Sequence, residues 1–323
     1  MRSLERWWWP LQLAAILGAA VFALVFHARL PSRLPSDDSY RQVAEVVARE
    51  ARPGDAVLLF PWWTDRARIW LPEDPPVVGY LGSDADPLVR HPRIWVLAQP
   101  NLPRADAAAF WRAFTPDRQR EGEARQFGNL QLTLFENGRH RPIRFSAPDE
   151  VDAAAHHSDS SGVAVYLEAP DGRRTPCPLD SAPGAYRCPG PPYLYARTEW
   201  HEVLYQPRRC LYMHAPGGAT RMVVELDRAA LGREALLEAG VIWEHAAKKG
   251  GGITPTQIAL EDASTGARLA GVVLLPGVEG FQSARITGDG AARAVRIAVS
   301  SLHPDAREIC VDFTAFGAQE PVR

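Results

Sequence analysis

Hydrophobic and polar positions divide the chain into three stretches of different character. The first contains a run of twenty residues, 7–26, in which Gln12 is the only polar side chain. A helix of this length rises about 30 Å, which matches the hydrocarbon core of a bilayer. Three tryptophans, 7–9, open the run, and indole rings favour the headgroup layer. Since no second run of this length occurs, the pattern predicts one membrane-spanning helix at the N-terminus.

The residues that flank this run leave two interpretations to compare. Arg2 and Arg6 precede it, which favours a cytoplasmic N-terminus, but Arg29 and Arg33 follow it, so counting charges does not fix the orientation. The alternative is a cleaved signal peptide. The one small-residue cleavage site, 21–23, falls inside the apolar run, which favours an uncleaved anchor. We therefore expect a single-pass protein of the inner membrane, with most of the chain periplasmic or extracellular.

The second stretch, residues 37–138, alternates apolar runs with segments of helical periodicity. A short Pro-containing linker, 30–36, precedes it. The predicted elements are a helix from about residue 37, strands 56–60, 76–80 and 94–97, a helix 104–114, and strands 119–126 and 130–135. This alternation predicts a small α/β domain with a mainly parallel sheet.

The third stretch, residues 151–323, follows a basic linker predicted at 139–150. Here helical periodicity nearly vanishes, and short segments alternate apolar and polar positions. Examples are 163–167, 211–213, 222–226, 295–299 and 309–313, with glycine-rich turn signals between them. Many short strands at this spacing predict an antiparallel β-sandwich. The expected fold class is therefore α/β plus all-β, behind a transmembrane helix.

Composition narrows the class of partner. The chain has 323 residues, with 36 lysines and arginines against 38 aspartates and glutamates, a net charge of −2. No basic field is available to hold nucleic acid, so we expect no nucleic-acid partner. The hydrophobic fraction of 46% and the charged fraction of 23% are those of a globular protein and exclude wholesale disorder.

The four cysteines all lie in the third stretch. An even number behind an export-type N-terminus favours disulfides over metal ligation. Cys177 and Cys188 bracket a short loop and are placed to join its ends, which leaves Cys210 to pair with Cys310. Four cysteines allow three pairings, and free thiols in a cytosolic protein are the alternative. A zinc site is disfavoured because no Cys-x-x-Cys pair is present.

Most catalytic signatures are absent. Residues 201–205 begin like a zinc-protease helix, but Tyr205 occupies the position of the second ligand histidine. No Gly-x-Ser-x-Gly elbow is present. Residues 156–161 carry two histidines and three serines in a segment typical of a solvated linker. We expect no catalytic residue, no resident metal and no cofactor.

One cluster is a candidate for ligand binding. Trp62, Trp63, Asp65, Arg66 and Arg68 come directly after the first predicted strand, at the carboxyl end where open α/β sheets place ligands. Indole rings stack on sugar faces, while the charged groups bond hydroxyls or a phosphate. Alternatively, the tryptophans cover the sheet edge or dock the other domain, and Asp65 caps a helix.

Two segments resemble known families. The motifs 51–58, 93–97 and 127–130 make residues 40–135 similar to the extracytoplasmic C-terminal domain of polyprenyl-phosphate-sugar glycosyltransferases of the protein O-mannosyltransferase-like superfamily. The catalytic acid of that family lies beside membrane spans that are missing here, so the resemblance implies no catalytic residue. The strand pattern of residues 163–316 resembles a jelly-roll module of the carbohydrate-binding kind.

Three functions follow as hypotheses. The first is a membrane-anchored accessory protein that binds cell-envelope glycan without turnover. The second is an enzyme acting on glycosyl substrates, with Asp65 as acid or base. The third is a docking protein for other envelope proteins, which requires a large exposed apolar patch on the sandwich.

Overall fold

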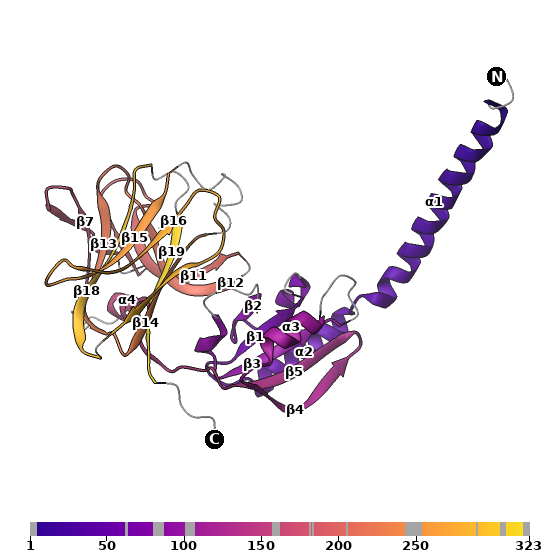
Figure 1. Ribbon diagram of the computed structural model, residues 1–323, viewed down its shortest axis with the longest axis horizontal. Helices are drawn as coiled ribbons and strands as arrows, with labels where there is room; N and C mark the ends of the chain where they lie inside the picture. The colour runs from indigo at the N-terminus through magenta and orange to yellow at the C-terminus, as the bar shows by residue number, and fades with distance from the viewer. Residues whose placement is uncertain are drawn as a thin grey trace. The chain divides into compact units, whose positions relative to one another are not determined.

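The computed structural model divides the chain into two compact units. One comprises Met1–Val77 and Arg93–Glu136, and the other comprises Val78–Pro92 and Asn137–Arg323. The structure describes residues 5–61, 64–79, 87–100, 107–156, 162–180, 182, 184–204, 206–242, 254–288, 290–303 and 308–318. Figure 1 shows the order of the elements along the chain.

The first element is the long helix α1 (Glu5–Arg33). Its segment Trp8–Arg29 is long and apolar enough to cross a membrane by length and composition, and none of that segment is buried against the rest of the protein. The twenty-residue apolar run is therefore helical (Figure 1). The side chains of residues 8–26 are exposed.

The α/β unit contains a five-stranded sheet in the order β2-β1-β3-β5-β4. Its elements are α2 (Asp37–Glu50), β1 (Ala56–Phe60), the 3-10 helix η1 (Asp65–Ile69), β2 (Val77–Gly79), β3 (Arg93–Ala98), α3 (Ala107–Phe114), β4 (Arg118–Phe127) and β5 (Leu130–Asn137). β1 and β3 are parallel, as predicted, but β3 pairs antiparallel with β5. The sheet is therefore mixed where the sequence predicted a mainly parallel one.

Helix α2 begins where its sequence supplies a cap. The hydroxyl of Ser36 accepts a hydrogen bond from the backbone N–H of Ser39 at 3.2 Å. Val43 and Val47 on its apolar face are fully buried against the sheet core. The turn between β4 and β5 contains Gly128 at φ +58°, where a Cβ would approach the Ser39 hydroxyl to 2.7 Å. A side chain at residue 128 would thus collide with the start of α2.

The second unit is a sandwich of two sheets. The six-stranded sheet has the order β16-β15-β18-β13-β7-β8, and the other has β17-β14-β19-β12-β11-β10-β9 with β6 paired to β19. The elements of the unit, in chain order, are η2 (Pro87–Arg90), β6 (Ile143–Ser146), α4 (Ala147–His156), β7 (Val163–Glu168), β8 (Arg174–Pro176), β9 (Leu179–Asp180), β10 (Ala185–Arg187), β11 (Tyr195–Val203), β12 (Gln206–His214), β13 (Arg221–Ala230), β14 (Glu234–Val241), β15 (Thr256–Asp262), β16 (Arg268–Leu274), β17 (Gln282–Thr287), β18 (Ala292–Ser301) and β19 (Glu308–Phe316).

The alternating apolar positions predicted from the sequence form the sandwich core. Leu211 and Met213 of β12 are fully buried, as are Val224 of β13 and Ile297 of β18, and all belong to one cluster. Wherever the structure describes the register of two paired strands in this unit, the pair is antiparallel, for example β12 with β19 and β13 with β18. The prediction of an antiparallel β-sandwich is thus confirmed as an architecture.

Both disulfides have the pairing that the sequence favoured. Cys210 of β12 joins Cys310 of β19, and these two strands are hydrogen-bonded neighbours. Cys177 follows β8 of the six-stranded sheet and joins Cys188, which follows β10 of the other sheet. The second bridge therefore links the two layers of the sandwich near their edges.

Two segments differ from the predicted organisation. Residues 139–150, expected as a linker, contain β6 and the start of α4, and Phe145 and Ala147 are buried in the sandwich core. Residues 78–92 run from within β2 to the residue before β3, but they group with the sandwich unit. The chain therefore passes between the units at three places instead of one.

Candidate functional site

Trp200 of β11 presents an open indole ring. It is 55% exposed, and among the described residues no other tryptophan outside α1 has an exposed side chain. Its cross-strand neighbour in β12 is Arg209. The strand β10 pairs with Tyr195 and Ala196 of β11, four to five residues before Trp200, so the indole lies beyond that pairing.

The charged groups near this indole come from its cross-strand neighbour in β12 and from α4. Arg209 forms ion pairs with Asp149 and, at 2.6 Å, with Asp152. The hydroxyl of Thr198, two residues before Trp200, donates to the carbonyl of Pro148 at 2.6 Å and holds the start of α4 against β11. A flat apolar ring thus lies beside carboxylates and a guanidinium that remain partly exposed. A sugar ring needs both, because its C–H faces pack on aromatic rings and its hydroxyls form hydrogen bonds.

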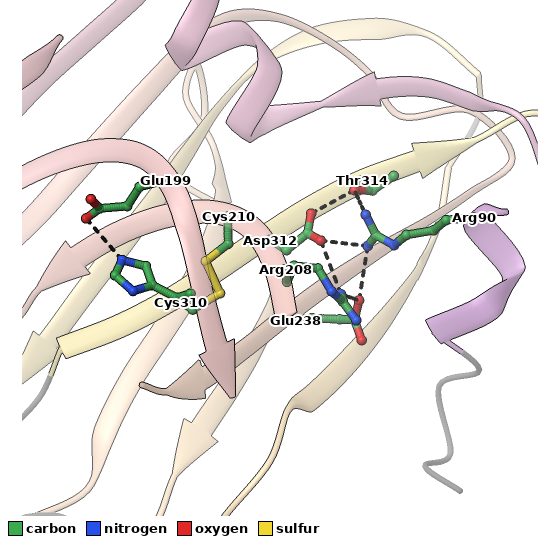
Figure 2. Close-up of a disulfide and its surroundings, with 9 residues drawn as sticks. Arg90, Glu199, Arg208, Cys210, Glu238, Cys310, Asp312 and Thr314 are labelled. Atoms are coloured by element: carbon green, nitrogen blue, oxygen red, sulfur yellow. Dashed lines mark hydrogen bonds and ion pairs between the residues drawn. A yellow bond between two sulfur atoms is a disulfide. The ribbon is translucent and has the colours of Figure 1, made fainter. Parts of the chain in front are cut away.

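A second group of charges is buried on the opposite face of the same sheet. Figure 2 shows the guanidinium groups of Arg90 and Arg208 against the carboxylates of Asp312 and Glu238. Arg90 Nη2 lies 2.8 Å from Asp312 and 3.0 Å from Glu238, and Arg208 pairs with the same two carboxylates. Thr314 accepts from Arg90 at 3.0 Å and donates to Asp312 at 2.8 Å.

The ionisation of this cluster follows from its pairing. Burial opposes the charge on Asp312, but Arg90 and Arg208 outweigh it and hold the pKa of the carboxyl below its ordinary value. Burial likewise opposes the charge on Arg208, while Glu238 and Asp312 raise its pKa. Two cations and two anions are thereby neutralised together. The four side chains are 1–13% exposed, so the cluster offers no open site for a ligand. Its ion pairs stabilise the fold of the sandwich unit.

A half-buried group of polar and aromatic residues lies near the Cys210–Cys310 bridge. The rings of Tyr195 and Tyr212 stack at 4.4 Å, and Glu199 Oε1 is 3.0 Å from His201 Nε2. Burial disfavours the charged form of Glu199, but His201 and Arg197 outweigh it and lower its pKa. Burial raises the pKa of Tyr212. Glu199 accepts hydrogen bonds from Arg197 and Tyr195. Among the described residues, Arg197 Nε and His201 Nε2 are buried without a hydrogen-bond partner.

The zinc-protease interpretation of residues 201–205 is excluded by the backbone. His201 lies on the strand β11, whereas that motif needs a helix to bring two histidines onto one face. Tyr205 and the histidine–serine segment 157–161 fall outside the described residues. Within the described ranges, no group of three histidine, cysteine or carboxylate side chains is placed to hold a metal ion.

The α/β unit contains a cavity of about 500 Å³. Trp95, Leu132 and Leu134 of the sheet contribute apolar atoms to its lining. The remaining lining residues are mostly charged: Glu50, Arg52, Arg93, Glu121, Gly122, Glu123 and Arg125. All of them belong to this unit. Its volume is within the range of small-molecule sites, about 300–1,000 Å³.

The binding residues predicted from the sequence are only partly described. Trp62 and Trp63 fall outside the described residues. Asp65, Arg66 and Arg68 belong to η1. Arg66 pairs with Asp37 at 2.6 Å, and Arg68 pairs with Asp65 at 3.2 Å, in both cases at the surface. The structure therefore engages these three charges in ion pairs, and their role in binding stays a prediction.

Trp200 was not among the binding residues predicted from the sequence, although the sequence of β11 carries a signal for it. Trp200 shares its side of β11 with Ala196, which is fully buried in the core. Between and beyond these two residues, the same side carries Thr198 and Glu202. Where one side of a strand changes from apolar to polar residues, the strand has extended beyond the hydrophobic core. A tryptophan at that position is therefore expected to be exposed.

Comparisons with known proteins give no family. No protein-family model matches the chain, and no curated protein matches it either. The resemblance of residues 40–135 to polyprenyl-phosphate-sugar glycosyltransferases is therefore not supported by these comparisons.

The solved structures similar to parts of the chain include carbohydrate-binding modules. The xylan-binding module CBM15 matches at 13% identity and a TM-score of 0.27, over 50% of this chain and 93% of its own. CsCBM6-3 from Clostridium stercorarium, in complex with cellobiose, matches at 10% identity and 0.24, over 40% and 84%. The CBM51-2 and INT domains of Clostridium perfringens ZmpB match at 8% and 0.27, over 37% of this chain and 26% of that one. With TM-scores below 0.5, these similarities assign neither a fold family nor a ligand.

Proposed function

We propose that the chain is a membrane-anchored, extracytoplasmic glycan-binding protein that acts as an accessory of the cell envelope without turnover of its own. The helix α1 supports the anchor, because its apolar segment is unburied and long enough to span a bilayer. The disulfides Cys177–Cys188 and Cys210–Cys310 support an oxidising compartment.

The observation that carries the proposal is the exposed indole of Trp200 beside Arg209 and its two carboxylate partners. Burying this ring against a sugar removes apolar surface from water, and Asp149, Asp152 and Arg209 supply acceptors and donors for hydroxyls.

The experiment is a thermal-shift screen of the full chain in detergent against neutral and acidic oligosaccharides of bacterial envelopes. A ligand present at a hundred times its Kd adds about 2.7 kcal/mol to the stability of the unit that binds it. For a unit of this size, this corresponds to a rise in Tm of roughly 5–10 °C. Chromatography of the incubated glycans is expected to show unchanged oligosaccharides. A flat screen would overturn the binding role, and the appearance of products would overturn the absence of turnover.

The cluster at η1 remains part of the proposal as a further contact for glycan. Trp62 and Trp63 supply the aromatic surface, and Asp65, Arg66 and Arg68 supply the charges. The alternative, in which Asp65 acts as acid or base of a glycosyl-transforming enzyme, requires turnover that Asp65→Asn abolishes. The docking alternative requires a partner protein that binds whether or not glycan is present.

A further inference from the structure

We propose that the cavity of the α/β unit is a second binding site, specific for a sugar acid that carries a single carboxylate. The choice of a sugar rests on the proposed glycan function, while the single negative charge follows from the ion pairs around the cavity.

Two of the three arginines that line the cavity are fully engaged. Arg93 donates to both oxygens of Asp55, at 3.0 and 2.7 Å, and to the carbonyl of Glu50 at 3.1 Å. Asp55 is 1% exposed and also accepts from the indole of Trp95 at 3.0 Å. Arg125 holds the two carboxylate oxygens of Glu50 at 2.7 and 2.6 Å. A ligand does not displace such bidentate pairs easily.

The third arginine, Arg52, has an available guanidinium. Its backbone N–H donates to Asp55 at 3.0 Å, but within the described part of the chain its side chain has no ion pair or hydrogen bond. Of the acidic residues at the rim, Glu123 pairs with Arg120 at 2.8 Å. Glu121 is 48% exposed and lies 3.7 Å from Arg93 Nη1. One cation and one partly satisfied carboxylate are therefore left to meet a ligand.

These two groups define the ligand chemistry. The guanidinium of Arg52 binds a carboxylate through two parallel N–H bonds. Glu121 is an acceptor and therefore selects a neighbouring hydroxyl. A dianionic phosphate fits poorly, because Glu50, Glu121 and Glu123 line the same cavity while only Arg52 is available to neutralise it. Apolar atoms of Leu134 and Trp95 in the lining suit the C–H surface of a pyranose.

The geometry of the lining leaves room for such a ring. Gly122 lies at the cavity, and a Cβ built on it would meet no heavy atom within 4 Å. Open space therefore adjoins the backbone of β4 next to Glu121, the carboxylate that is only partly satisfied.

The test is isothermal titration of the full chain in detergent with glucuronate and galacturonate, and with glucose, galactose and glucose 6-phosphate as comparison ligands. We expect binding of at least one uronate that is tenfold or more tighter than that of its neutral counterpart and of the sugar phosphate. Arg52→Ala is expected to weaken uronate binding by tenfold or more. Arg41→Ala, which removes an exposed arginine of α2 that does not line the cavity, is expected to leave uronate binding unchanged.

The outcomes separate this site from the one at Trp200. Trp200→Ala is expected to leave uronate affinity unchanged, because Trp200 belongs to the other unit. Equal binding of uronate and neutral sugar, absence of uronate binding, or an Arg52→Ala variant with the affinity of the wild type would each overturn the proposal. The proposed function has its own test, which is the binding of neutral glycan. If Arg52→Ala keeps this binding and Trp200→Ala loses it, the proposed function stands even where the uronate site is overturned.

Discussion

Arg90 attaches the segment that contains η2 to the sandwich unit. It lies in η2, between β2 and β3 of the α/β unit in sequence, yet its guanidinium reaches Glu238 of β14, 148 residues away. The amide of Asn137 reinforces the attachment by donating to the carbonyls of Leu88 and His91 at 2.8 and 2.9 Å. The segment around η2 is thus held by buried charge and by hydrogen bonds from the side chain of Asn137 to its backbone carbonyls.

Arg90→Ala is expected to destabilise the sandwich unit strongly. The substitution leaves Asp312 and Glu238 with only Arg208 to neutralise them, and removal of one partner from a buried ion pair costs about 3–5 kcal/mol. Chemical denaturation of the full chain, followed by the near-ultraviolet signal of its tyrosines and tryptophans, measures the loss.

Two further variants test this explanation. Arg120→Ala removes an exposed ion pair with Glu123 and is expected to cost less than about 1 kcal/mol. Adding Asp312→Asn to Arg90→Ala removes the excess buried charge and is expected to recover part of the loss. If Arg90→Ala and Arg120→Ala had the same stability, the buried cluster would not have the structural role assigned to it.

At the scale of elements, α2 and β4 are joined by the ion pair of Glu50 with Arg125. The hydrogen bonds from Arg125 lower the pKa of Glu50 from 4.5 to about 2. Because the carboxyl is a stronger acid in the folded state, its contribution to stability is complete above pH 4.5 and is lost as the pH falls toward 2.

Glu50→Gln is therefore expected to melt at a lower temperature than the wild type at neutral pH, and to converge with it as the pH approaches 2. The measurement is a series of melting curves across that range. Glu45→Gln is the matched control, since Glu45 is an exposed carboxylate of the same helix with no ion pair among the described residues. A wild-type advantage that persisted unchanged at pH 2 would contradict the assigned pairing.

Strands with strict alternation were predictable from the sequence. In β12 and β19 the apolar positions Leu211, Met213 and Val311 point into the core, which places Cys210 and Cys310 together on the other face. The linker prediction for residues 139–150 was wrong because the short strand β6 and the helix α4 derive their burial from distant partners. Phe145, for example, pairs with Ala315 of β19.

The mixed sheet of the α/β unit was missed for a related reason. The strand β5 has an apolar pattern that suits either a parallel or an antiparallel neighbour, and only its pairing with β3 distinguishes them. Candidate sites are likewise not predictable where their residues meet only through tertiary packing. Arg52 and Glu121 are 69 positions apart and polar, so nothing in their local sequence indicates a shared cavity. A cavity forms when elements pack together, so the periodicity of hydrophobic positions in the sequence does not predict it.

At the scale of the whole molecule, the chain contains an unburied apolar helix, a disulfide-bonded sandwich and an exposed indole. The two units are linked by three passages of the chain, at residues 77–78, 92–93 and 136–137. A cut at the single boundary predicted near residue 138 would therefore separate η2 from the sandwich that it belongs to. Functional measurements accordingly require the full chain.

The most direct test of the central claim is the affinity of the full chain for the glycan found in the screen, measured for the wild type and for Trp200→Ala. The variant is expected to fold with the same melting temperature in the absence of glycan, because an exposed substitution changes stability by about 0.5 kcal/mol or less. We expect at least tenfold weaker binding, equivalent to about 1.4 kcal/mol. Trp200→Phe should retain part of the affinity, and Leu302→Ala, which removes another exposed apolar side chain of this unit, should retain all of it. Wild-type affinity in Trp200→Ala would contradict the account.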